Sequence, residues 1–177
     1  MPALYELRNL PQGTSKTLVG SRGNYYEFED GSRIDVHSAP VWCRRCGDFV
    51  DGEVIESLEE IDQQLADLEN PKTELYAWTR NTGPGSKGTF RRLWVAKTQE
   101  RRRWRARRVS PPRCLLCGST DIVSLPCDVE VPDPRGTGVV VLTVTGHCST
   151  WFNEWFFSPE GERIPRDTKP TYWTLPG

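Results

Sequence analysis

One short phrase occurs twice in this chain and constrains its fold more than any other feature. Residues 43–47 read Cys-Arg-Arg-Cys-Gly, and residues 114–118 read Cys-Leu-Leu-Cys-Gly. Each phrase puts two thiols on one tight turn, and its glycine accepts the backbone conformation that closes such a turn. Two turns of this kind supply four soft ligands, as a tetrahedral metal site requires. The residues between the two phrases must then leave one point in space and return to it.

These thiols predict one structural Zn²⁺ ion, with Cys43, Cys46, Cys114 and Cys117 as its ligands. The alternatives are four unligated thiols or two disulfides, but the paired spacing is typical of reduced, metal-bound cysteines. An all-cysteine shell leaves no position for a bound water molecule, so we expect the ion to stabilise the fold rather than to catalyse a reaction.

The paired phrases resemble the knuckles of zinc ribbons, in which two such turns meet at the end of a small antiparallel sheet. The resemblance covers the knuckles and their flanking strands, about a third of the chain. The spacing departs from the family pattern, because 67 residues (47–113) separate Cys46 from Cys114, against roughly 15–20 in common sites. As a whole the chain is similar to small bacterial zinc-ribbon proteins with a split ribbon, and that similarity implies no activity.

The separation indicates an insertion, which we predict to be a helical hairpin. Ser57 and Glu60 fit a capping box, and an apolar stripe follows at helical spacing, formed by Leu58, Ile61, Leu65 and Leu68. Residues 73–80 add a helical turn or two, residues 81–89 form a glycine-rich loop, and a second helix is expected over 90–108. The predicted hairpin therefore has an acidic arm, a glycine-rich tip and a basic arm.

The rest of the sequence predicts strands. Residues 25–29 and 33–37 flank Asp30-Gly31, a strong hairpin turn. Residues 139–144 are predicted to be buried on both faces, and residues 151–157 form an aromatic strand. The fold class is therefore α+β, in a single domain over 1–177. Within it, 1–52 is an N-terminal β segment with the first knuckle, 53–110 is the inserted hairpin, and 111–177 holds the second knuckle, further strands and a Pro-rich tail.

Charge is segregated along the insertion, although the net charge of the chain is only −1. Ten acids and one base lie between Asp48 and Glu74, and ten bases and one acid lie between Arg91 and Arg113. Arginines around a tryptophan can neutralise phosphates and stack on bases. The candidate nucleic-acid-binding residues are Arg101, Arg102, Arg103, Trp104, Arg105, Arg107 and Arg108. The alternative is that the basic arm pairs with the acidic arm inside the protein.

The aromatic strand offers a second surface. We expect it to pack in the core, and the alternative is a platform for a partner formed by Trp151, Trp155 and Phe157. The chain carries no catalytic motif and only two histidines. The predicted function is therefore that of a non-catalytic, zinc-stabilised binding or adaptor protein that acts through protein–protein contacts. The alternative is a nucleic-acid-binding protein that uses the Arg-rich helix.

The remaining cysteines, Cys127 and Cys148, lack the paired spacing and are predicted to be buried free thiols; a second metal site or a disulfide is the alternative. No stretch reads as a signal peptide or a membrane span. Reduced, metal-bound thiols then indicate a cytoplasmic protein.

Overall fold

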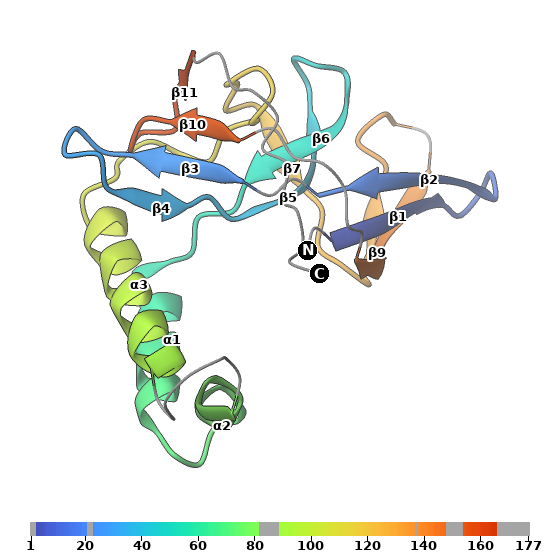
Figure 1. Ribbon diagram of the computed structural model, residues 1–177. Helices are drawn as coiled ribbons and strands as arrows, with labels where there is room; N and C mark the ends of the chain where they lie inside the picture. Colours follow the sequence, from blue (N-terminus) through green and yellow to red (C-terminus); the bar gives the residue numbers. More distant parts are fainter. Residues whose placement is uncertain (1–2, 21–22, 82–88, 137, 148–153, 166–177) are drawn as a thin grey trace, which may run out of the picture. The chain divides into compact units, whose positions relative to one another are not determined.

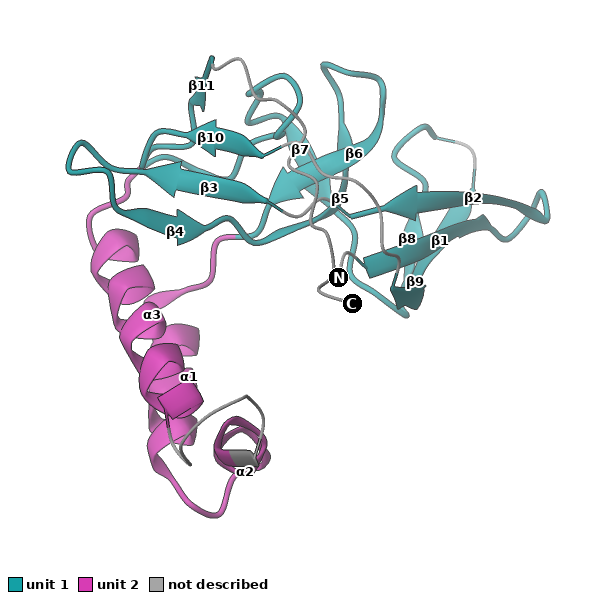
Figure 2. Cartoon of the chain, in the orientation of Figure 1, with its two compact units in different colours: residues 1–54, 110–177 teal, residues 55–109 magenta. Residues whose placement is uncertain are grey.

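The computed structural model describes residues 3–20, 23–81, 89–136, 138–147 and 154–165, which form three helices and eleven strands. The fold is therefore α+β, as predicted. The chain divides into two compact units (Figure 2), one formed by residues 1–54 with 110–177 and the other by residues 55–109. In the described residues, all strands lie in unit 1 and all helices lie in unit 2.

The first sheet of unit 1 joins the start of the chain to a late segment. Its strand order is β2-β1-β9-β8, with β1 at Ala3–Asn9, β2 at Thr14–Val19, β8 at Glu130–Pro132 and β9 at Val139–His147 (Figure 2). All its pairings are antiparallel, and Leu7 of β1 lies opposite Leu142 of β9. The sequence did not indicate this long-range pairing, since neither strand carries a mark of its partner.

The second sheet has the order β11-β10-β3-β4, with β3 at Asn24–Glu27, β4 at Arg33–Asp35, β10 at Trp155–Phe157 and β11 at Arg163–Ile164. The predicted hairpin is confirmed, because β3 and β4 pair antiparallel around a turn in which Asp30 accepts hydrogen bonds from Ser32. Strand β10 pairs parallel to β3 and antiparallel to β11.

The third sheet, of order β6-β5-β7, carries the two Cys phrases. Strand β5 (Ser38–Cys43) pairs antiparallel with both β6 (Asp48–Glu53) and β7 (Ile122–Ser124). The main core of unit 1 lies between this sheet and the first one, and its buried members are Leu7, Phe49, Leu125, Val140 and Leu142. The core thus fixes the sheet from which the two turns project.

One strand prediction is wrong in its burial. Residues 139–144 were expected to be buried on both faces, but along β9 only Val140 and Leu142 are fully buried, and Val144 is exposed. Val140 and Leu142 face the core, whereas Val139, Val141 and Thr143 on the opposite face are only half-buried. The continuous run of valines therefore reflects β-propensity rather than two-sided burial.

Unit 2 consists of α1 (Leu58–Glu69), α2 (Glu74–Asn81) and α3 (Thr89–Arg105). The capping box is confirmed, since Ser57 and Glu60 exchange hydrogen bonds between side chain and backbone. Of the apolar stripe, Ile61 and Leu68 are fully buried, whereas Leu58 is exposed. The segment after α1 forms a helix of about two turns, α2, as predicted. Helix α3 ends at Arg105 instead of continuing to residue 108.

Helices α1 and α3 run antiparallel. Arg91, near the start of α3, donates to the carbonyl of Leu68 at the end of α1, and Arg105, at the end of α3, donates to the carbonyl of Glu56 just before α1. The two arms of the insertion therefore lie side by side within unit 2, as Figure 1 shows.

Candidate metal centre

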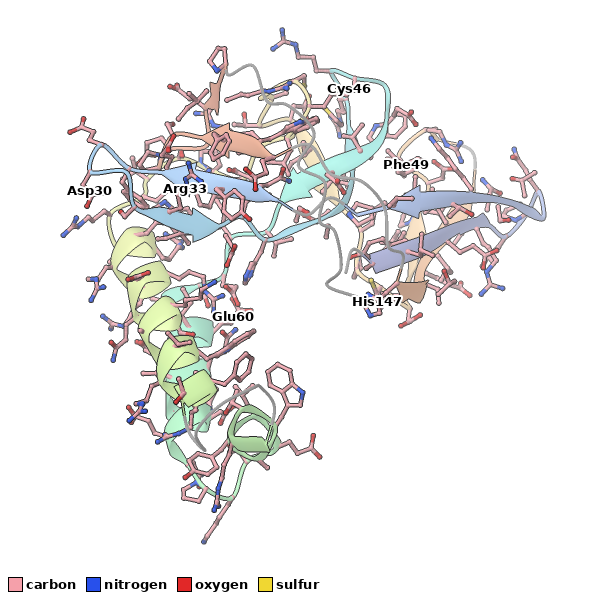
Figure 3. The ribbon with its side chains drawn as sticks, viewed as in Figure 1. Asp30, Arg33, Cys46, Phe49, Glu60 and His147 are labelled. Carbon is pink, nitrogen blue, oxygen red and sulfur yellow. The ribbon has the colours of Figure 1, made fainter. Side chains whose placement is uncertain are left out.

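The first Cys turn connects β5 to β6. Cys43 ends β5, Cys46 lies in the turn (Figure 3), and the amide of Gly47 donates to the carbonyl of Cys43 over 2.8 Å. The amide of Cys46 points at the sulfur of Cys43, 3.5 Å away. Gly47 has a φ of 65°, a left-handed conformation that side chains rarely adopt, so the final glycine of the phrase is required by the backbone.

The second Cys turn repeats this geometry. The amide of Gly118 donates to the carbonyl of Cys114 over 2.9 Å, and Gly118 has a φ of 73°. The amide of Cys114 donates to the carbonyl of Ser119 over 2.8 Å, which closes the loop on its other side. The same local sequence has therefore produced the same local backbone twice, at places far apart in the chain.

Strand pairing brings the two turns together. Backbone hydrogen bonds join Glu53 to Arg113 and Leu115 to Asp51, and Cys114 forms a bridge with Gly52. The glycine is needed there, because a Cβ at this position would lie 2.6 Å from two carbon atoms of the Val41 side chain. The second turn is thus fixed against the strand that leaves the first one.

The four sulfurs form one cluster. All four lie within 4.8 Å of one another, with 3.6 Å from Cys43 to Cys117 and 3.9 Å from Cys46 to Cys114. A metal–sulfur distance of about 2.3 Å in a tetrahedron requires sulfurs roughly 3.8 Å apart, so the thiols fit a single ion. Cys43 and Cys114 are buried and the other two are half-buried. The cluster can therefore hold one metal ion and is consistent with a zinc-binding site.

The protonation of these thiols is unequal. Burial, followed by hydrogen bonds with the other cysteines, raises the pKa of Cys46 well above its usual range. Burial acts in the same direction on Cys117, but hydrogen bonds from Ser119 and from the other three cysteines outweigh it and lower the pKa to about 7. A bound cation would displace the protons of these thiols, because thiolates rather than thiols ligate metals.

The sequence did not single out Glu53, a buried carboxylate beside the cluster. Glu53 accepts a hydrogen bond from the hydroxyl of Tyr26 over 2.9 Å and another from the amide of Arg113 over 2.9 Å. Both Glu53 and Tyr26 are buried. The carboxylate ties the segment that enters the second turn to β3, and the sequence showed it only as one acid among ten.

The Arg-rich segment is largely engaged within unit 2. Arg101 forms an ion pair with Glu56 at 3.0 Å and a hydrogen bond with Gln64, and Arg102 pairs with Asp62. These contacts match the alternative in which the basic arm pairs with the acidic arm. Three members of the run, Arg102, Arg103 and Arg107, are exposed, and of these Arg102 forms the pair with Asp62.

Trp104 does not have the position that a base-stacking ring requires. Only 6% of its surface is exposed, and the guanidinium of Arg108, itself buried, lies 5.2 Å from the ring centre. Arg105, the remaining member of the run, is half-buried and donates to the carbonyls of Glu56 and Arg108. A nucleobase therefore has no access to the indole at the centre of the predicted surface.

The aromatic strand packs inward. Phe156 and Phe157 are buried, and the guanidinium of Arg163 lies 4.4 Å from the ring centre of the half-buried Trp155. Trp151 lies outside the described residues. Core packing, the expected arrangement, therefore accounts for the part of the strand that the structure describes, and Phe157 is not available as a contact for a partner.

Two further expectations concern cysteine and membrane segments. Cys127 is a free thiol, as predicted, but it is exposed rather than buried; Cys148 lies outside the described residues. Among the described residues, Cys43, Cys46, Cys114 and Cys117 are the only group of three or more potential ligands that could hold a metal ion. None of the described helices combines the length and the apolar character needed to cross a membrane.

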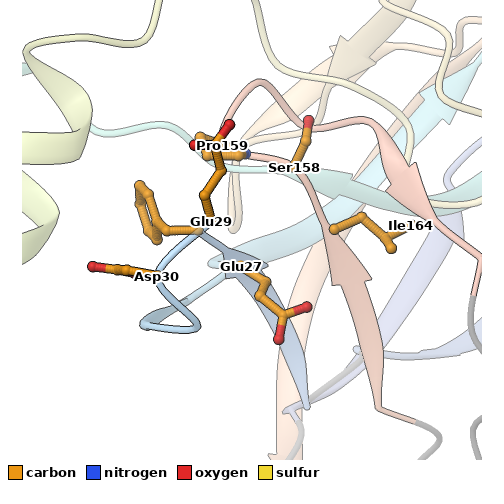
Figure 4. A pocket seen from close by; sticks show the side chains of 7 residues that line it. Glu27, Glu29, Asp30, Ser158, Pro159 and Ile164 are labelled. Atoms are coloured by element: carbon orange, nitrogen blue, oxygen red, sulfur yellow. The ribbon is translucent and has the colours of Figure 1, made fainter.

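Unit 1 also has an open cavity of about 650 Å³ beside the β3–β4 turn (Figure 4). Its lining includes Glu27, Glu29, Asp30, Ser158 and Ile164. Glu27 pairs with Arg33, and Asp30 accepts two hydrogen bonds from Ser32, which lower the pKa of that carboxyl. These acids therefore stabilise the hairpin that carries them.

Comparison of the chain with protein-family models, with curated proteins and with solved structures finds no match. The likeness to zinc ribbons thus depends on the Cys phrases and on the sheet that carries them.

Proposed function

We propose that this chain is a non-catalytic binding protein whose unit 1 is stabilised by one zinc ion. The observation that carries the proposal is the set of four thiols within 4.8 Å of one another, supplied by two turns with the same hydrogen bond and a left-handed glycine. Zn²⁺ is favoured because it prefers tetrahedral thiolate sites and imposes no other geometry. With four protein ligands the ion has no open position, so its role is to hold the fold.

The binding surface belongs to the helical unit in this proposal. Of the strand residues that the sequence offered as a platform for a partner, Trp155 is half-buried and Phe157 is buried. Unit 2, in contrast, exposes two tryptophans, Trp78 and Trp94. The proposal covers both partner classes that the sequence predicted, a protein or a nucleic acid.

Elemental analysis of the purified, untagged protein after a brief chelator rinse tests the metal part of this proposal. We expect one equivalent of zinc in the wild type and its loss in Cys114→Ser. Cys127→Ser is the matched control, because it removes an exposed thiol outside the cluster and should leave the zinc content unchanged. A wild-type content below half an equivalent of any transition metal would refute the proposal.

A further inference from the structure

Arg113, the residue immediately before the second Cys turn, has a buried nitrogen atom without a hydrogen-bond partner. Its side chain is half-buried, and its Nε atom is shielded from water with no acceptor among the described residues. The only other such atom in the described part of the chain is Nε of Arg101, which lies 3.0 Å from a carboxylate oxygen of Glu56. Buried polar atoms without partners are rare in native proteins. Arg113 therefore requires an explanation that Arg101 does not.

The position of Arg113 is fixed at both ends of the residue. Its backbone amide donates to the carboxylate of the buried Glu53 over 2.9 Å, and its carbonyl accepts from the amide of Glu53 over 2.9 Å. At the far end of the side chain, Nη1 donates a long hydrogen bond of 3.5 Å to the carbonyl of Gly118. Gly118 follows Cys117 directly and closes the turn onto Cys114. The guanidinium group therefore lies against the turn that supplies two of the four thiols.

The other cations of the Cys turns have a different environment. Arg44 and Arg45 lie within the first turn, and both are exposed. Arg44 forms an ion pair with the exposed Asp121 at 3.7 Å. Among the described residues, the guanidinium of Arg113 forms no ion pair with a carboxylate. Water screens the charges of Arg44 and Arg45, whereas the charge of Arg113 is partly withdrawn from water and lacks a counter-ion.

The proposed metal centre supplies the missing negative charge. A zinc ion carries two positive charges and its four thiolate ligands carry four negative ones, so the loaded centre is a dianion. Two of its ligands, Cys43 and Cys114, are buried. Charge that is withdrawn from water needs a partner of opposite sign nearby. Neutral thiols would not need a cation beside them, but a zinc–thiolate shell does.

We infer that Arg113 is a positioning residue of the metal centre. Its guanidinium group compensates part of the negative charge of the zinc–thiolate shell, and its hydrogen bond to Gly118 holds the second Cys turn in the conformation that ligates the ion. Groups of this kind, outside the ligands themselves, commonly change metal affinity by about 10–100-fold. The inference rests on the proposed function, since it requires that the four thiols hold zinc.

The test measures the zinc affinity of the full-length protein by competition with a chromophoric chelator. Arg113→Gln removes the charge, and we expect it to weaken zinc binding about tenfold. Arg113→Lys keeps the charge but has no planar group that can serve two acceptors, so its affinity should lie between those of the wild type and Arg113→Gln. Arg45→Gln is the matched control, because it removes an exposed cation from the other Cys turn and should leave the zinc affinity unchanged.

Cobalt(II) in place of zinc gives a spectroscopic measurement that a merely structural role of Arg113 would not change. The intensity of the thiolate-to-cobalt charge-transfer band should be the same in all variants, since all four thiolates still bind. In Arg113→Gln the band should move to longer wavelength, because the electrons of the thiolates lose the stabilisation of a nearby positive charge. Arg45→Gln should show the wild-type band.

The possible results separate this inference from the proposed function. A wild-type protein that holds less than half an equivalent of metal would refute both. One equivalent in the wild type with undiminished affinity in Arg113→Gln would overturn the inference alone, and so would equal losses in Arg113→Gln and Arg45→Gln. If Arg113→Lys binds zinc no better than Arg113→Gln, the charge is not what matters. If Arg113→Gln fails to fold even with excess zinc, the residue supports the fold independently of the metal, which also overturns the inference.

Discussion

The two units of this chain are stabilised in opposite ways. Unit 1 is built from segments that are distant in sequence: β1 pairs with β9, and β5 pairs with β7 across the whole insertion. Unit 2 is one continuous stretch, residues 55–109, in which a capping box and neighbouring helices make most of the contacts. Contacts between segments close in the sequence therefore determine the fold of unit 2, whereas the fold of unit 1 requires pairing between strands that are far apart in the sequence.

This difference explains why a metal ion would stabilise unit 1 rather than unit 2. Closing the 67-residue separation between the Cys turns costs about 4 kcal/mol in chain entropy by the logarithmic loop term alone. Structural zinc binding in small peptides contributes about 10–16 kcal/mol, which exceeds that cost. Unit 2 requires no such link, because its helices follow one another closely along the chain.

Removing one metal ligand should unfold unit 1 and spare unit 2. In Cys114→Ser the proposed zinc shell is incomplete and the two Cys turns are no longer joined, so we expect a loss of several kcal/mol of stability in unit 1. Amide hydrogen exchange should show deprotection of β5, β6 and β7, with α1 and α3 still protected. A variant with an unchanged melting temperature and unchanged exchange would contradict the proposed role of the metal.

A cavity in unit 2 should have the converse effect. Leu68 has no exposed surface in α1, so Leu68→Ala should destabilise the helical unit by about 2–5 kcal/mol. The helical ellipticity should then melt at lower denaturant concentration, while the metal content of the protein stays at one equivalent. Loss of metal together with loss of helix would mean that the two units unfold as one, which would remove the distinction between them.

The same contrast governs what the sequence could predict. The capping box, the β3–β4 hairpin and the two Cys turns follow from short local rules, and the structure confirms each of them. The pairings of β1 with β9 and of β10 with β3 were missed, because strand pairing depends on the arrangement of the whole unit and leaves no local mark.

The candidate sites show the same limit. The cluster of four cysteines was predictable because its spacing repeats, whereas the buried Glu53 beside it carries no motif. Composition alone drew attention to Trp104 within the run of arginines, but packing buries that ring and leaves Trp78 and Trp94 exposed. Which aromatic residue remains at the surface depends on how the helices pack, and helical periodicity gave no means to decide it.

The glycines of the two Cys turns should give smaller effects, confined to unit 1. A Cβ on Gly118 would meet nothing within 4 Å, so only its φ of 73° opposes a side chain. Gly118→Ala, and likewise Gly47→Ala, should cost about 1–2 kcal/mol and weaken zinc binding. Gly146→Ala is the control, because its added methyl group also meets nothing and its backbone is not left-handed. Thermal melts should lower the midpoint for the first two variants only; equal melts for all three would show that the turns tolerate an ordinary residue.

The smallest effect is expected at the exposed ion pair of unit 2. Arg102 and Asp62 are 45% and 48% exposed, so water and salt screen their attraction, and Arg102→Gln should scarcely change the melting temperature at neutral pH. The hydrogen bond from Arg102 lowers the pKa of Asp62. This contribution is therefore present above the ordinary carboxyl pKa of about 4 and is lost as the pH falls through the lowered value. Any difference in melting temperature between Arg102→Gln and the wild type should vanish in acid, and a difference that grows there would contradict the pairing of Arg102 with Asp62.

Arg101→Gln, which breaks the less exposed pair with Glu56, should destabilise unit 2 more than Arg102→Gln does, because burial rather than the number of charges decides what an ion pair contributes.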